Sequence, residues 1–142
     1  PDPPGLIGQP LRETRAHFYA STEFRNRHGR PKGAADLSRY DFIGFDQNER
    51  FLPIINALGL SLTLRNFKLS SGSGTVMEEL IRHGLGIGML TEDSASLYPE
   101  LERALPSLPG VPVPIWLVTH RELHTSRRIR LVFDLLAQEL GG

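Results

Sequence analysis

The chain has 142 residues, of which 39% are hydrophobic and 23% charged, a composition typical of one soluble globular domain. Sixteen Lys and Arg balance sixteen Asp and Glu, which argues against a free-standing nucleic-acid binder, because such proteins usually carry a strong positive field. The absence of cysteine excludes disulfides, thiolate zinc sites and a cysteine nucleophile, and no stretch resembles a membrane span or an export signal.

The first ten residues, PDPPGLIGQP, contain four prolines and no initiator methionine. Proline fits neither a helix interior nor a central strand, so this stretch predicts an extended connector, and we expect the chain to be a fragment of a longer protein. Residues 17–21 then predict a short aromatic strand that ends at a helix-capping serine, Ser21. Gly29 is the expected end of the helix that follows.

The next elements are a loop with one helical turn at 30–40, a strand at 41–46 and a short helix at 51–58. Pro53 would lie near the first turn of that helix, where a missing N–H costs little. Beyond it, apolar and polar residues alternate with the period of a half-buried strand that runs to Ser70 or Ser71. The apolar positions of this alternation are Leu60, Leu62 and Leu64.

An amphipathic helix is predicted at 76–83, ended by Gly84, before a strand at 87–90 and a turn rich in Ser, Thr and Asp. Residues 113–119 are continuously apolar, as in a strand buried on both faces of a parallel sheet, with Pro114 at its start. A last helix capped by Ser126 follows; its apolar positions are Ile129, Val132, Phe133, Leu136 and Leu140. Strands that alternate with short helices indicate an α/β fold.

Residues 71–75 read SGSGT at the predicted change from strand to helix. Backbone N–H groups and the helix dipole at such a place favour an anion such as a carboxylate or phosphate. The stretch lacks the Lys-Ser/Thr ending of a P-loop and the third glycine of a dinucleotide-binding turn. It is therefore either a contact for a small anion or a plain helix cap. Gly84 is interpreted as a helix stop, and Gly86 and Gly88 as places of close backbone packing.

No other cluster predicts chemistry, so we expect no catalytic residue, metal or cofactor. His120 and His124 lack a third ligand, and no G-x-S-x-G motif is present. Glu78 and Glu79 are interpreted as a solvated helix face, and the basic stretch at 120–130 as the polar side of the last helix.

Three stretches in register resemble the effector-binding domain of LysR-type transcriptional regulators. They are FYASTEFRNRHGRPKGAADLSRYDFIGFD, then GLGIGML after a helix, then LERALPSLPGVPVPIWLVTHRELHTSRRIRLVFDLLAQEL. The resemblance covers nearly the whole chain and implies a two-lobed α/β fold like that of periplasmic binding proteins. This chain would hold mainly the second lobe and the C-terminal helix of the first.

The resemblance also implies domain boundaries. Residues 1–20 would form a connector and the first crossover strand, 21–115 the second lobe, and 116–142 the return crossover strand and the first lobe's C-terminal helix. The winged helix-turn-helix that binds DNA, and much of the first lobe, would precede Pro1. Thr91 departs from the family pattern, which commonly has proline there, so we expect a less constrained turn after that strand.

Members of the family bind small effectors, often organic acids, between their lobes. Carried onto this chain, the resemblance implies effector contacts at Ser70, Ser71, Gly72, Ser73, Thr75 and Phe45. It implies a cytoplasmic regulator without a membrane partner, assembled as a homodimer or homotetramer partly through the helix at 76–83, and meeting DNA only through the missing domain. The alternatives are a periplasmic solute-binding protein and a small α/β enzyme. An enzyme would need titratable groups that converge in the cleft, whereas hydroxyls and backbone amides suffice for an effector.

Overall fold

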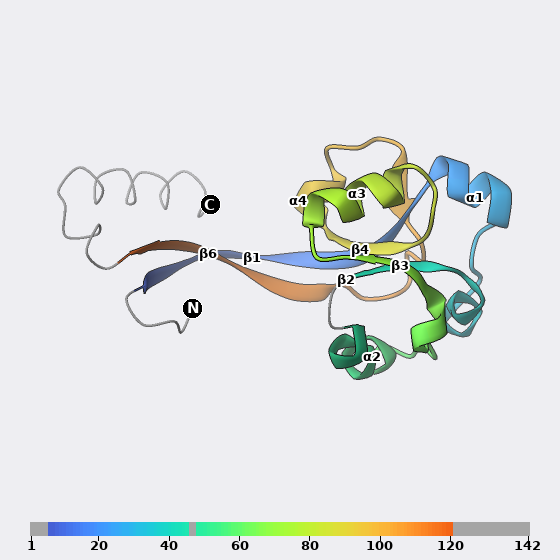
Figure 1. Ribbon diagram of the computed structural model, residues 1–142, viewed down its shortest axis with the longest axis horizontal. Coiled ribbons are helices and arrows are strands. Elements are labelled where there is room, and N and C mark those ends of the chain that lie inside the picture. The colour runs from blue at the N-terminus through green and yellow to red at the C-terminus, as the bar shows by residue number, and fades with distance from the viewer. Residues whose placement is uncertain (1–5, 46–47, 121–142) are drawn as a thin grey trace. The chain divides into compact units, whose positions relative to one another are not determined.

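The structure is a computed structural model that describes residues 6–45 and 48–120 (Figure 1). The chain divides into two compact units, a central unit of Arg15–Val111 and a terminal unit of Pro1–Thr14 and Pro112–Gly142. Strand β1 (Leu6–Ser21) and strand β6 (Val111–His120) pair with each other, and each contributes residues to both units. How these units correspond to the expected lobes stays a prediction.

β1 is far longer than the predicted strand at 17–21. It begins at Leu6, so the second half of the expected connector is strand. Pro10 lies within β1 but outside residues 16–21, where the strand pairs with its two neighbours in the central unit. A proline is tolerated where a strand does not need its N–H for the ladder. Pro112 and Pro114 likewise lie inside β6. Pro114 was predicted at the start of its strand, but β6 begins at Val111, three residues earlier.

The strands of the central unit run in mixed directions. β4 (Gly88–Thr91) and β5 (Leu101–Arg103) both pair antiparallel with β1, whereas β2 (Phe42–Phe45) and β3 (Phe67–Ser71) pair in parallel. Ile87 joins β2 to the start of β4, because its carbonyl accepts from Ile43 N at 2.7 Å and its amide donates to the Asp41 carbonyl at 2.9 Å. The expected parallel sheet is therefore correct only for β2 and β3.

The pleat of these strands separates two apolar layers. Phe18 and Phe42 belong to one buried cluster, while their chain neighbours Tyr19 and Ile43 belong to the other, as the two-residue period of a strand requires. Helices α3 (Gly74–Arg82) and α4 (Glu92–Ala95) cover one side of the strands, and α2 (Asn48–Asn56) lies on the other (Figure 1). The first cluster comprises Phe18, Ala20, Phe24, Leu37, Phe42, Leu60, Leu62, Ile87, Ala104, Leu105 and Leu108. The second comprises Tyr19, Ile43, Met77, Ile81, Leu90, Ala95 and Leu101.

Local capping signals set the helix boundaries, as predicted for α1 (Thr22–His28) and α3. The Ser21 hydroxyl accepts from Phe24 N at 3.1 Å, and Gly29 ends α1 with a φ of 79°. The loop after α1 contains one 3₁₀ segment, η1 (Ala34–Arg39), where one helical turn was expected. Gly84, with a φ of 77°, directly follows the last turn of α3. These predictions are confirmed.

The close-packing interpretation of Gly86 and Gly88 is also confirmed. A Cβ at Gly86 would lie 2.9 Å from Ile43 Cδ1 and 3.1 Å from the Asp41 carbonyl oxygen. A Cβ at Gly88 would overlap the side chain of Ile81. Both positions leave no room for a side chain, because β2 and α3 pack directly on the backbone here.

α2 begins before the predicted helix, and Pro53 is its sixth residue, not part of its first turn. The prediction was wrong because proline removes only its own N–H. Its carbonyl still accepts from Ala57 N at 3.0 Å, so the helical turns continue past it.

The predicted strand ending at Ser70 or Ser71 is divided in two. Leu60 and Leu62 are buried as the alternation predicts, but Leu64 is 48% exposed. Thr63 and Asn66 form a capping box that starts a short 3₁₀ turn, η2 (Leu64–Asn66), and β3 begins only at Phe67. Side chain to backbone hydrogen bonds compete with strand pairing at this point.

β5 and α4 were not predicted. The Thr91 hydroxyl accepts from Ser94 N at 3.3 Å and thereby caps α4. This cap holds the turn through a hydroxyl group, and the expectation that the turn is less constrained than one with proline stays a prediction. The predicted last helix, its cap, His124 and the basic stretch after His120 lie outside the described residues, as does burial of the 113–119 strand on both faces.

Candidate functional site

The strands β2 and β3 end side by side, and this brings the predicted site residues together. In their parallel register Phe45 lies opposite Ser71 and Gly44 opposite Ser70. The chain then passes through Gly72 and Ser73 into α3, whose first turn contains Thr75. We call residues 70–75 the serine turn. In open α/β sheets, ligands bind beyond the carboxyl ends of the strands, which is where this turn lies.

Three hydroxyl groups of the serine turn each accept one hydrogen bond. Ser70 Oγ accepts from Asn48 Nδ2 at 2.8 Å, and Ser71 Oγ accepts from Ser73 N at 3.0 Å. Ser73 Oγ caps α3 by accepting from Val76 N at 3.3 Å. Because a hydroxyl group has one proton as well as its lone pairs, each of these serines can still donate to a ligand.

Apolar surface borders the serine turn. Phe45 is 42% exposed at the end of β2, and its ring atom Cζ lies 4.0 Å from the place that a Cβ on Gly74 would occupy. The ring therefore lies against the start of α3, at a distance that would be ordinary contact for a side chain at Gly74. Leu69 on β3 and Val76 on α3 are 40% and 47% exposed. Hydroxyl donors and exposed apolar side chains occur together in this part of the molecule.

Asn48 is a residue of this site that the sequence analysis missed. Its amide group orients Ser70, and it occupies space that exists only because Gly44 lacks a side chain. A Cβ at Gly44 would lie 2.7 Å from Asn48 Cγ. The glycine in the middle of the apolar stretch Phe42–Phe45 was the available signal, since such a glycine marks close approach of another group.

The clearly shifted titratable groups lie outside residues 70–75. A hydrogen bond from Arg82 Nε to Glu100 Oε1 at 2.8 Å lowers the pKa of Glu100 and raises that of Arg82. The pKa of Asp36 is lowered, first of all by the backbone N–H of Lys32. Burial raises the pKa of Tyr19. Among the described residues, the serine turn itself offers hydroxyl groups and backbone N–H groups.

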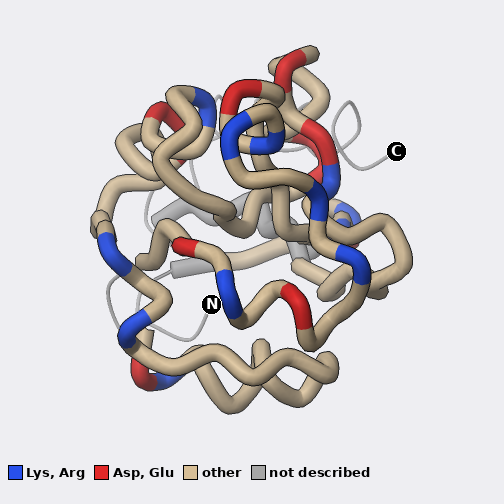
Figure 2. Tube along the Cα trace, turned by 90° about the vertical axis from the view of Figure 1, so that its right-hand side faces the viewer, with Lys and Arg blue, Asp and Glu red and all other residues tan. Residues whose placement is uncertain are grey.

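Charged residues of both signs are interspersed along the chain (Figure 2). Within the described ranges, no three His, Asp or Glu residues gather as metal ligands. The described helices include none that is long and apolar enough to cross a membrane.

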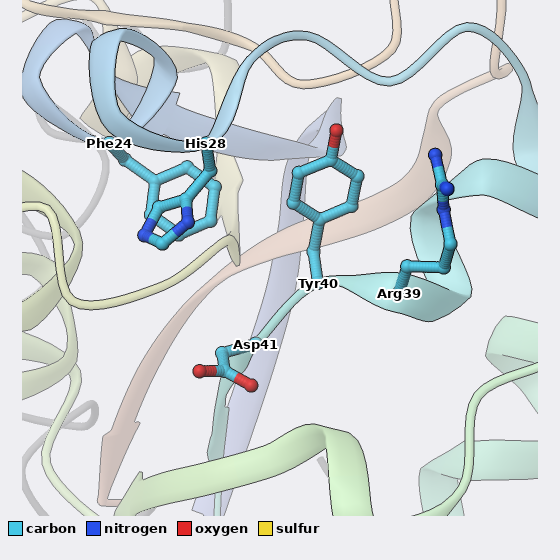
Figure 3. A pocket seen from close by; sticks show the side chains of 5 residues that line it. All are labelled: Phe24, His28, Arg39, Tyr40 and Asp41. Carbon is cyan, nitrogen blue, oxygen red and sulfur yellow. The ribbon is translucent and has the colours of Figure 1, made fainter.

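A hollow lies in the central unit, away from all predicted site residues. It has a volume of about 470 Å³ and is lined by Phe24, His28, Arg39, Tyr40 and Asp41 (Figure 3). These residues come from α1, from η1 and from the link to β2. The hollow was not predicted from the sequence, because neither residues 24–28 nor residues 39–41 carry a ligand-binding motif by themselves.

The chain matches the LysR substrate binding domain family over residues 1–141 and belongs to that family. Its fold is the α/β fold of LysR regulatory domains, as the resemblance implied. The solved structures that this chain resembles are domains of transcriptional regulators. Such domains are not enzymes. No curated protein sequence matches the chain.

Three solved structures illustrate the similarity. The regulatory domain of CrgA, a LysR-type transcriptional regulator from Neisseria meningitidis, has a TM-score of 0.80 at 22% identity, with 99% of this chain and 72% of that chain covered. The effector domain of the transcriptional regulator AmpR of Pseudomonas aeruginosa has a TM-score of 0.72 at 14% identity, with 96% and 65% covered. Full-length AphB, a virulence activator of Vibrio cholerae, has a TM-score of 0.70 at 15% identity, with 98% and 49% covered.

Proposed function

We propose that this chain is the effector-sensing part of a LysR-type transcriptional regulator, and that its serine turn binds a small organic acid. One observation carries the proposal: the parallel ends of β2 and β3 bring three hydroxyl groups, each with a proton still to donate, to the start of α3. The contacts would be Ser70, Ser71, Gly72, Ser73 and Thr75, with Phe45 beside them.

The start of α3 favours a negative charge. The first N–H groups of any helix lack partners within the helix, and Ser73 satisfies that of Val76. The amides of Gly74 and Thr75 remain for solvent or for a ligand. The helix dipole adds about 0.3–1 kcal/mol for an anion at an exposed helix start. A carboxylate could accept hydrogen bonds from these amides and from the serine hydroxyls at the same time. A neutral ligand would form weaker hydrogen bonds with the same donors.

The position of Phe45 indicates that the expected effector carries an apolar group in addition to its carboxylate. The exposed ring borders the serine turn, so a ligand that places its carboxylate on the hydroxyls can cover part of that ring with an apolar group. Burial of apolar area contributes about 25 cal/mol per Å². We therefore expect an organic acid with an aromatic or aliphatic group rather than a small polar acid such as formate.

Within the longer protein we place the missing DNA-binding domain before residue 1 and the second lobe at 21–115, flanked by the crossover strands of 1–20 and 116–142. The family's small-molecule effectors change transcription through such domains. We expect a cytoplasmic homodimer or homotetramer that catalyses no reaction. A periplasmic solute receptor would share the binding site, so sequence-specific DNA binding by the longer protein distinguishes the two functions.

The test measures the thermal unfolding of this chain with pairs of ligands. Each pair consists of a carboxylate and the neutral amide of the same acid, such as benzoate and benzamide. A ligand at one hundred times its Kd adds about 2.7 kcal/mol to the free energy of unfolding. We expect a stabilising carboxylate whose amide has no effect. Ser71→Ala and Phe45→Ala should reduce that stabilisation, while Ser107→Ala, an exposed serine away from the turn, should leave it unchanged.

Ser73→Ala needs separate treatment because the hydroxyl caps α3. Loss of the cap alone costs about 1 kcal/mol, so the ligand-induced change in Tm is compared, not the Tm itself. Stabilisation by amides as large as by carboxylates would contradict an anion site at the turn. Full ligand response in Ser71→Ala and Ser73→Ala would leave the turn as a helix cap only.

A further inference from the structure

The hollow lined by α1, η1 and the start of β2 has three ring-bearing walls. Phe24 and His28 lie with ring centroids 4.6 Å apart, and Phe24 and Tyr40 with centroids 6.1 Å apart. Phe24 is buried at 3% exposure, which fixes the floor of the arrangement. Figure 3 shows the Phe24 and His28 rings together on one side, Tyr40 on the other, and the Asp41 carboxylate below and between them. The volume of about 470 Å³ lies in the range of small-molecule pockets.

Charge distinguishes this hollow from a plain apolar depression. Arg39, which also lines the hollow, is paired with the carboxylate of Asp36. The Asp41 side chain, in contrast, makes no ion pair or hydrogen bond with another described residue. The hydroxyl of Tyr40 and the ring nitrogens of His28 are likewise without hydrogen bonds to the described residues. One carboxylate without an ion pair or hydrogen bond to a described residue therefore lines the hollow, below the rings in Figure 3.

The backbone at Asp41 is held in place, although the Asp41 residue itself is exposed. Its carbonyl accepts from Ile87 N at 2.9 Å, and Gly86 packs so closely that a Cβ there would lie 3.1 Å from that carbonyl oxygen. Asp41 directly precedes β2, whose far end is Phe45. Phe45 lies four residue steps along the strand from Asp41, about 13 Å at 3.3 Å per step. The hollow is thus distinct from the serine turn.

We propose that this hollow is a second ligand site, which takes a small organic cation whose ammonium group pairs with Asp41 while its apolar part lies among Phe24, His28 and Tyr40. Aromatic faces attract cations, and an unpaired carboxylate beside them selects the same charge. An anionic ligand would be repelled by that carboxylate, and a neutral one would leave it without a counter-charge. The site is independent of the effector proposed for the serine turn.

Three aromatic probes that differ mainly in charge test the proposal on the unaltered chain. They are phenylethylammonium, neutral 2-phenylethanol and the anion 3-phenylpropionate, each titrated while the backbone amide resonances of Asp41 and Phe42 are followed by NMR. We expect saturable shifts with phenylethylammonium, at a Kd at least about tenfold below those of the other two. No saturable shift with the cation, or equal affinity for all three, would overturn the proposal.

Variants then locate the charge. Asp41→Asn should weaken phenylethylammonium binding at least about tenfold, and Tyr40→Leu should weaken it as well. Glu23→Gln, an exposed acid in the first turn of α1 that does not line the hollow, removes the same charge and should leave the Kd within about twofold. If Asp41→Asn and Glu23→Gln weaken phenylethylammonium binding equally, the effect comes from net charge alone, and the site is refuted. If Asp41→Asn fails to fold, the three-probe comparison decides alone.

The serine-turn variants separate this inference from the proposed function. Ser71→Ala and Ser73→Ala should bind phenylethylammonium as the unaltered chain does. If either substitution abolishes that binding, the cation occupies the turn and the second site is refuted, whatever the outcome with carboxylates.

Discussion

Replacing Gly88 with alanine should destabilise the central unit by about 1–3 kcal/mol, the usual cost of extra volume in a packed core. The new Cβ would overlap Ile81 Cδ1 and lie 2.7 Å from Ile81 Cγ1. Ile81 is completely buried, so its side chain has no open space to enter. Gly88 itself is paired with Tyr19 in the ladder between β1 and β4, which holds the strand in place. Either Ile81 leaves its preferred rotamer or β4 shifts.

Urea and thermal unfolding followed by circular dichroism measure this effect. Gly33→Ala is the matched control, because no atom lies within 4 Å of its would-be Cβ and its φ of −168° is extended backbone. The control should be neutral or up to about 1 kcal/mol more stable, through the lower entropy of its unfolded chain. For a chain of this size, each kcal/mol changes Tm by roughly 3–5 °C. Equal stability of the two alanine variants would refute the packing argument.

A double variant identifies the atoms responsible. Ile81→Val removes Cδ1, and alone it should cost about 0.5–1.5 kcal/mol. The double variant with Gly88→Ala should lose less unfolding free energy than the two single variants together, by about 0.5 kcal/mol or more. The reason is that the overlap with Cδ1 disappears. Simple additivity would mean that Gly88 is constrained by something other than Ile81.

Three further predictions concern stability. Ser21→Ala should cost about 1 kcal/mol in urea unfolding, because Phe24 N loses its cap. Leu37→Ala should cost about 2–5 kcal/mol, since Leu37 is 0% exposed, whereas Leu97→Ala, at 71% exposure, should change the free energy of unfolding by less than about 0.5 kcal/mol. Glu100 has a pKa below its usual 4.5 in the folded chain, so its stabilising effect is present above that pH and is lost as the pH falls through the folded value. Glu100→Gln should therefore make the decline of Tm between neutral and acid pH shallower, and an unchanged decline would rule this out.

Much of the local structure could be predicted from neighbouring residues. The boundaries of α1 and α3 follow from a serine before each helix and a glycine after it, because caps act on the nearest backbone groups. The serine turn follows in the same way, since a strand pattern passes into an amphipathic helix within a few residues. The amphipathic pattern also predicted an apolar face of α3. Met77 and Ile81 on that face are buried, but Val76, which the pattern placed there too, is 47% exposed.

The failures are equally physical. Leu60, Leu62 and Leu64 share a period, yet the capping box of Thr63 with Asn66 ends that period before Leu64. β5 has only three residues, too few for a period to be recognised. Its place in the fold is set by antiparallel pairing with residues 19–21 of β1, far away in the sequence.

The sequence by itself therefore determined the α/β class, the family, the helix caps and the serine turn, because each depends on residues close together in the chain or on ordered motifs. Only the tertiary structure decided that Phe45 lies opposite Ser71, that Asn48 orients Ser70, and that Asp41 lines the same hollow as the rings of α1 and Tyr40. Strand direction and register arise from contacts between distant residues, and side-chain periodicity carries no information about which strands pair. The sites are assembled by that pairing.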